Sequence, residues 1–106
     1  AYQNYTAKSQ VTACLAEIAP GKTAFEIKMN EGTASATMTA AQMGINTKAC
    51  SDVEITSTPT SGAGSIKGTV AGGPKVSGKF VTLSRDTAGA WSCASTVDDA
   101  YKPTNC

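Results

Sequence analysis

Histidine is absent from this chain of 106 residues. Its absence removes the side chain that proteins use most often as a general base and as a metal ligand. The sequence also contains no nucleophile motif and no glycine-rich phosphate loop ahead of a helix. We therefore expect neither an enzyme nor a metal or cofactor site.

Strong charge of either sign is also missing. Nine Lys and Arg residues against eight Asp and Glu residues leave a formal net charge of +1, and the basic residues are scattered. Proteins that bind nucleic acids or membrane surfaces usually cluster their basic side chains, so charge does not indicate DNA as a partner. No apolar run in the sequence reaches the roughly 20 residues that cross a bilayer.

The first thirty residues carry a helical pattern. Apolar side chains recur mostly three, four or seven residues apart, at Tyr5, Val11, Cys14, Leu15, Ile18, Phe25 and Met29. This spacing predicts a helix over residues 1–30. Pro20 and Gly21 predict a kink or break within it. The unbroken spacing favours one bent helix, and the alternative is two separate helices.

This helix is too long for its domain. At about 1.5 Å per residue it would measure about 44 Å, whereas a domain of about 100 residues has a radius of gyration near 13 Å. One end should therefore extend beyond the globular part or lie against another molecule. We expect this to be the first turn or two, and we assign Tyr2 and Tyr5 to assembly.

Residues 31–51 form a long connection with little periodicity. Within it, Thr39 and Gln42 are spaced as a capping box, and Gly44 can end a short helical turn. A sheet is expected over residues 52–95, where apolar and polar residues alternate around glycine-rich turns at 58–64 and 86–89. Its four strands read as an antiparallel meander whose apolar face needs the helix as cover.

Four cysteines in a chain of this length, without a C-x-x-C pair, indicate disulfides in an oxidising compartment. Three pairings are allowed. We favour Cys93 with Cys106, which ties the polar C-terminal segment to the last strand. Cys14 with Cys50 would then fasten the helix to the connection. The fold class is α+β: one domain in which a long N-terminal helix packs on a four-stranded sheet closed by a disulfide loop at 93–106.

The C-terminal segment resembles the closing loop of type IVa pilins, notably those of Pseudomonas. Trp91 stands two residues before Cys93, twelve residues separate Cys93 from Cys106, and the chain ends in the pattern Tyr101-x-Pro103-x-x-Cys106. Residues 1–9 are similar to the segment that follows the hydrophobic N-terminal stretch of such pilins. The order of elements between these two ends also matches, so the resemblance covers the whole chain.

The resemblance implies the pilin fold and a structural subunit of a type IV pilus, which self-assembles into a helical filament and supports adhesion and twitching motility. It further implies that a hydrophobic half-helix, absent from this form, precedes Ala1. That segment would hold the protein in the inner membrane before assembly into the extracellular pilus at the cell surface. DNA uptake is a further activity of the family.

By the same resemblance, the closing loop contacts host glycans or abiotic surfaces, largely through main-chain groups. The residues assigned to this contact on that basis are Ala94, Ser95, Thr96, Val97, Asp98, Asp99, Ala100, Tyr101, Lys102, Pro103, Thr104 and Asn105. Simpler interpretations remain for some of them: a solvated turn for Asp98 and Asp99, and packing for Tyr101. Trp91 is also expected to pack.

Two other functions fit the pattern. One is a pseudopilin of a type II secretion system, a class that commonly has a calcium site where this chain has its last two cysteines. The other is a free secreted binding module stapled by two disulfides, which would leave the projecting aromatic end of the helix unexplained.

Overall fold

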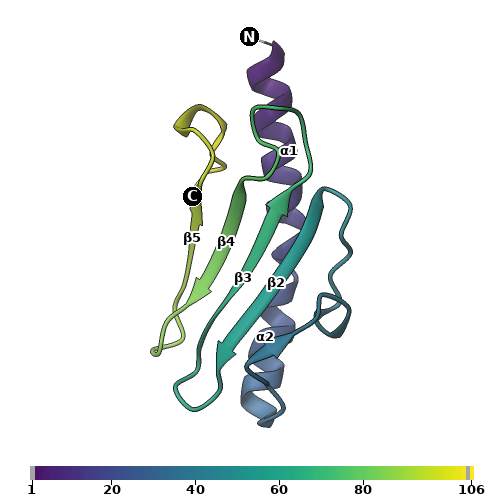
Figure 1. Ribbon diagram of the computed structural model, residues 1–106. Helices are drawn as coiled ribbons and strands as arrows, with labels where there is room; N and C mark the ends of the chain where they lie inside the picture. Colours follow the sequence, from purple (N-terminus) through teal and green to yellow (C-terminus); the bar gives the residue numbers. More distant parts are fainter. Residues whose placement is uncertain (1, 105) are drawn as a thin grey trace.

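The computed structural model describes residues 2–104 and 106. It begins with two helices, α1 (Tyr2–Ile18) and α2 (Gly21–Glu31), that follow nearly the same direction (Figure 1). The turn between them confirms the predicted break at Pro20, a residue that cannot donate a hydrogen bond to the carbonyl of Ala16. Pro20 keeps helical dihedral angles, with φ −60° and ψ −23°. The single bent helix expected over residues 1–30 is therefore interrupted, although its direction is kept.

The α2 helix ends where the sequence predicts. Gly32 adopts the left-handed conformation with φ 72°, and its N–H donates to the carbonyl oxygen of Met29. Such a C-cap favours glycine because other residues are strained at positive φ. In the described part of the chain, no helix is both long and apolar enough to cross a membrane.

A five-stranded antiparallel sheet covers one side of the helices (Figure 1). Its strands, in spatial and chain order, are β1 (Thr37–Met38), β2 (Cys50–Thr58), β3 (Ala63–Val70), β4 (Phe80–Arg85) and β5 (Trp91–Ser95). The expected meander of four strands is thus present as β2 to β5. The prediction missed β1, because two residues are too few to show alternation, and it started β2 two residues late, beyond a bulge between Cys50 and Asp52.

The core lies between the helices and the inner face of the sheet. Its fully buried side chains are Val11, Cys14, Ile18, Phe25, Cys50, Ile55, Ile66, Val70, Val76 and Val81. The helices approach β3 closely because two glycines lie on its inner face. A Cβ atom on Gly64 would lie 2.4 Å from Cζ of Phe25, and one on Gly68 would lie 2.9 Å from Sγ of Cys14.

The connection between α2 and β2 contains the predicted helical turn as the 3₁₀ helix η1 (Ala41–Met43). The capping box is formed: the Thr39 N–H donates to Oε1 of Gln42 at 2.9 Å, and the Gln42 N–H donates to Oγ1 of Thr39 at 3.2 Å. Local sequence specifies this turn, because both partners of the box lie within four residues of each other.

Candidate functional site

One face of α1 stays uncovered by the sheet and forms a shallow, mostly apolar groove of about 560 Å³. We call it the helix strip; its residues are Tyr5, Lys8, Ser9, Thr12, Ala13 and Ala16. Tyr5 is 74% exposed and, with Ile27 on α2, is one of two large apolar side chains exposed in the described chain. The side chain of Tyr2, the other residue assigned to assembly, lies outside the described part of the structure.

The two small hydroxyl side chains of the helix strip, Ser9 and Thr12, are turned back onto the helix. The Ser9 hydroxyl donates to the Tyr5 carbonyl oxygen at 2.9 Å, and the Thr12 hydroxyl donates to the Lys8 carbonyl oxygen at 2.8 Å. Hydroxyls bonded in this way offer their carbon atoms to a neighbour rather than a free donor. The helix strip can therefore pack against another apolar surface without losing these hydrogen bonds.

The opposite side of α1 is held to the rest of the molecule by polar contacts and a disulfide. The Glu17 carboxylate accepts hydrogen bonds from the N–H groups of Lys48 and Ala49. The shortest N–O distance is 2.6 Å for Lys48 and 2.5 Å for Ala49. One turn earlier, Cys14 is bonded to Cys50. These contacts fix the orientation of α1, so the helix strip faces outward.

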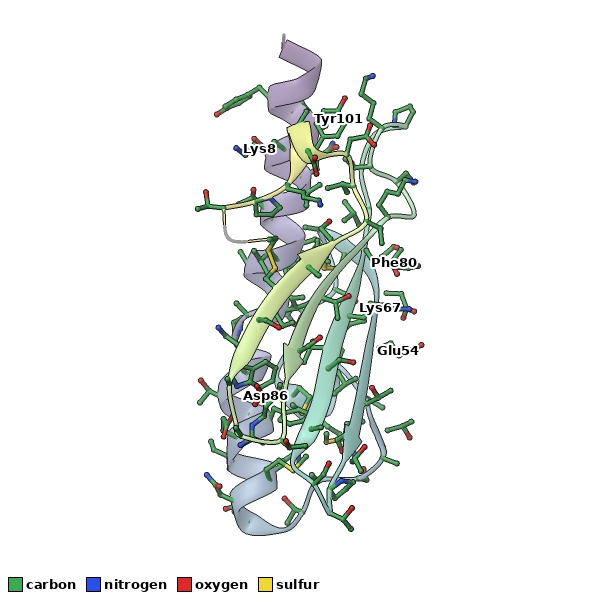
Figure 2. All side chains as sticks on the ribbon, turned by 90° about the vertical axis from the view of Figure 1, so that its left-hand side faces the viewer. Lys8, Glu54, Lys67, Phe80, Asp86 and Tyr101 are labelled. Carbon is green, nitrogen blue, oxygen red and sulfur yellow. A yellow bond between two sulfur atoms is a disulfide. The ribbon has the colours of Figure 1, made fainter. Side chains whose placement is uncertain are left out.

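The closing loop, residues 93–106, packs against α1 beside the helix strip through its 3₁₀ helix η2 (Asp99–Tyr101) (Figure 2). The bond between Cys93 and Cys106 closes it, as the sequence predicts. Val97 and Tyr101 are buried, with 4% and 5% of their surface exposed, and Pro103 is buried as well. Packing is thus the role of these three side chains, which are withdrawn from the contact surface expected for the whole loop.

Other residues of the closing loop remain at the surface. Ser95 and Lys102 are half-buried, the former donating to the Phe80 carbonyl oxygen and the latter forming an ion pair of 3.0 Å with Asp99. The exposed residues are Ala94, Thr96, Asp98, Asp99, Ala100 and Thr104. Asn105 lies outside the described residues. The loop thus presents a polar, mostly small-residue surface on an apolar base.

The sequence interpretation missed a polar cluster that joins α2 to the other end of the sheet. Nε of Arg85 donates to Oε1 of Glu26 at 2.6 Å, and the indole N–H of Trp91 donates to the same oxygen at 2.9 Å. Arg85 also donates to the carbonyl oxygen of Gly62. The Trp91 ring meets Phe25 edge to face, with centroids 5.3 Å apart. Trp91 therefore packs, as predicted, with its polar end satisfied by Glu26.

This cluster predicts an acid-sensitive contribution to stability. Hydrogen bonds from Arg85 and Trp91 lower the pKa of the Glu26 carboxyl. Because the folded pKa lies below the unfolded one, the contribution is full above the unfolded pKa and is lost as pH falls through the folded pKa. We expect Glu26→Gln to lower the free energy of unfolding at pH 7, and we expect this difference from the parent to shrink as pH falls through the folded pKa of Glu26, measured by urea titration.

The matched control is Glu31→Gln, which removes an exposed carboxylate at the end of the same helix. This control should keep the pH profile of the parent protein. If the free energy of unfolding of Glu26→Gln fell with decreasing pH just as in the parent, the cluster would make no pH-dependent contribution.

Comparisons with known proteins agree with this arrangement. A family model described as pilin, of the bacterial filament, matches residues 7–106. The type IV major alpha-pilin of Moraxella bovis is 28% identical over 128 aligned residues, covering 100% of this chain and 80% of that protein. Fimbrial protein Q of the same organism is 31% identical over 118 aligned residues, covering 97% of this chain and 74% of that protein. With its helix strip, meander sheet and disulfide-closed loop, the chain belongs to the pilin family of bacterial filament proteins.

Proposed function

We propose that this chain is a structural subunit of a type IV pilus at the cell surface. The observation that carries the proposal is the helix strip, a shallow apolar face on a helix whose other side is fixed to its own domain. Such a face is suited to packing against the helices of neighbouring subunits in a filament. The names of the two relatives, a type IV major alpha-pilin and a fimbrial protein, support the same assignment.

The proposal includes an inner-membrane stage before assembly, in which a hydrophobic segment encoded upstream of Ala1 would hold the subunit. Helix α1 would continue into that segment. Tyr2 and Tyr5, in the first turns of α1, would then lie where the filament core begins.

We further propose that the filament adheres through the exposed part of the closing loop. The buried side chains of Val97, Tyr101 and Pro103 provide the base that holds this part outward. Host glycans and abiotic surfaces are the partners we propose. The exposed surface combines small residues with two carboxylates, at Asp98 and Asp99, and so offers main-chain groups and hydrogen-bond acceptors rather than a large apolar patch.

The alternatives have less support. Pseudopilins commonly hold the C-terminal segment with a calcium site. In this chain the Cys93–Cys106 bond holds it instead. A free secreted binding module would not need an apolar helix face beside its closing loop. Both observations favour the pilus subunit.

A matched pair of substitutions separates assembly from adhesion. Ala13 on the helix strip and Ala100 on the closing loop are both exposed, so each can be replaced by arginine without burying a charge. In cells whose only pilin is the variant, Ala13→Arg should abolish surface filaments seen by electron microscopy, because the charge would enter the subunit contact. Ala100→Arg should leave filaments intact and reduce their adhesion to a glycan array or to polystyrene.

As isolated domains, the Ala13→Arg and Ala100→Arg variants should both unfold at the same temperature as the parent protein. Normal filaments from Ala13→Arg would overturn the assembly role of the helix strip. Undiminished adhesion by Ala100→Arg filaments would count against the loop.

A further inference from the structure

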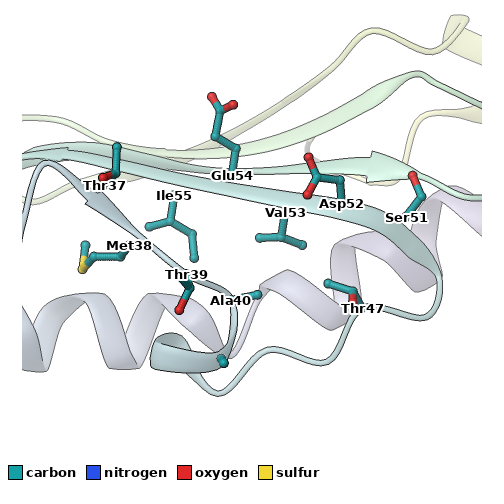
Figure 3. A pocket seen from close by; sticks show the side chains of 11 residues that line it. Thr37, Met38, Thr39, Ala40, Thr47, Ser51, Asp52, Val53, Glu54 and Ile55 are labelled. Carbon is teal, nitrogen blue, oxygen red and sulfur yellow. The ribbon is translucent and has the colours of Figure 1, made fainter.

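A groove of about 560 Å³ opens beside β2, where β1 leaves the sheet (Figure 3). We call it the edge groove; it is lined by residues 37–41, Thr47 and residues 51–55. Strand β1 pairs with β2 only at Thr37 with Thr56 and at Met38 with Ile55. After Met38 the chain turns away into η1, and among residues 2–104 and 106 no strand pairs with the remainder of this β2 edge.

The main chain of Val53 faces this open edge. The N–H of Ser57 donates to the Ala36 carbonyl oxygen, so the main-chain groups of Ser57 point toward β1. Alternate residues of a strand direct these groups to the same side, which places those of Ile55 and Val53 on that side as well. Ile55 has Met38 as its partner, whereas in the described chain the pairing stops before Val53.

Side chains alternate along this part of β2. Val53 and Ile55 point toward the helices, whereas Asp52 and Glu54 point to the outer face of the sheet (Figure 3). Neither carboxylate belongs to an ion pair within the described residues, where Glu26 with Arg85 and Asp99 with Lys102 are the pairs formed.

The lysine paired with Glu54 in the strand register directs its ammonium group toward an aromatic ring. Lys67 lies directly opposite Glu54 on β3, yet its ammonium group sits 4.3 Å from the centre of the Phe80 ring (Figure 2). None of the described residues that line the edge groove is basic. It therefore combines an unpaired stretch of main chain with two carboxylates that lack a partner cation.

We propose that the edge groove binds a short extended segment of a partner protein, in which one apolar residue stands between two Lys or Arg residues. Paired antiparallel to β2, the central residue of the segment would exchange main-chain hydrogen bonds with Val53 and direct its side chain into the groove. Its two neighbours would point to the outer face, opposite Asp52 and Glu54. Strand addition supplies the main-chain bonds, and the alternation of side chains sets the basic–apolar–basic pattern.

The probe is the peptide Lys-Val-Lys-Thr, amidated at its C-terminus, whose residues would face Glu54, Val53, Asp52 and Ser51 and leave Met38 paired with Ile55. It is titrated into the ¹⁵N-labelled chain and followed by NMR chemical shifts. The chemical-shift changes should centre on Val53 and on the facing residues 39–41. They should saturate as the peptide is added, and the fitted affinity should be weak because the peptide is short and makes few contacts. The peptide Glu-Val-Glu-Thr, amidated in the same way, should bind at least about tenfold more weakly, because two favourable cross-strand pairs become repulsive.

Three variants test the geometry. Asp52→Asn with Glu54→Gln should weaken binding of the lysine peptide about tenfold, since both cross-strand charge pairs are lost. Glu31→Gln removes an exposed carboxylate at the end of α2, outside the lining of the edge groove, and should leave the affinity unchanged. Val53→Pro removes an N–H that points away from β3, a change that an edge position tolerates, and should abolish binding.

Equal binding of the two peptides, or shifts centred outside the edge groove, would overturn the proposal. So would an unchanged affinity in the Asn and Gln double variant. Shifts at Val53 that grow with protein concentration in the absence of peptide would instead identify a second copy of this chain as the occupant. None of these outcomes depends on whether the chain builds a pilus.

Discussion

Replacing Cys14 and Cys50 together by alanine is expected to lower the free energy of unfolding by about 4 kcal/mol. The bond joins residues 36 positions apart, and closing a loop of that size removes many conformations from the unfolded chain. Both cysteines are fully buried in the core. The bond also lies beside Glu17, whose carboxylate holds the last residues of the connection.

Urea unfolding at fixed pH, read from the near-UV signal of Trp91, measures this loss. Replacing Cys93 and Cys106 by alanine should cost less, about 3 kcal/mol, because that bond spans a separation of only 13 residues. The order of the two effects is part of the prediction. A loss below about 1 kcal/mol for the Cys14 and Cys50 pair would mean that the remaining contacts of α1 already hold the connection in place.

Elements whose determinants are local could be predicted from the sequence. The break at Pro20, the cap at Gly32 and the capping box of Thr39 with Gln42 each depend on residues within a few positions. The alternating strands β2 to β5 follow from the period of two. The C-terminal disulfide could also be predicted, because a polar terminal segment with a final cysteine needs an anchor.

Features set by tertiary contacts could not be predicted in this way. Strand β1 exists because two residues of the connection meet the edge of β2, and nothing in their own sequence distinguishes them. The cluster of Glu26, Arg85 and Trp91 joins residues 59 and 65 positions apart. No local pattern marks such partners, since only the packing of α2 on the sheet brings them together.

In the candidate site, too, some features could be predicted from the sequence and others depend on tertiary contacts. The projecting aromatic end of α1 followed from its length, whereas the apolar character of the helix strip depends on where two hydroxyls point. In the closing loop, the interpretation of Tyr101 as a packing residue agrees with its burial. The burial of Val97 was not separable from a contact role by sequence, because an apolar residue in a surface loop fits both.

Gly68→Ala is expected to lower the free energy of unfolding by about 3 kcal/mol, the upper range for overpacking a core. A Cβ atom at this position would lie 2.9 Å from Sγ of both Cys14 and Cys50 and 3.2 Å from Cγ2 of Ile18. A disulfide fixed at both ends cannot move aside as a flexible side chain can. Gly73→Ala is the matched control, because its nearest neighbour, Oε1 of Gln10, would be 3.8 Å away; it should change stability by less than about 1 kcal/mol.

The cause of the Gly68 effect can be isolated by a double-mutant cycle with the disulfide. In a background of Cys14→Ala and Cys50→Ala, the two sulfur atoms that crowd position 68 are gone, and of the three nearest atoms Cγ2 of Ile18, at 3.2 Å, remains. Gly68→Ala should then cost about 1 kcal/mol or less, giving a coupling of about 2 kcal/mol between the glycine and the bond. An equal cost in both backgrounds would show that Gly68 is required by the strand itself. A reduced cost would show that this glycine allows the disulfide to lie between α1 and β3, and so allows the helix to rest on the sheet with the helix strip turned outward.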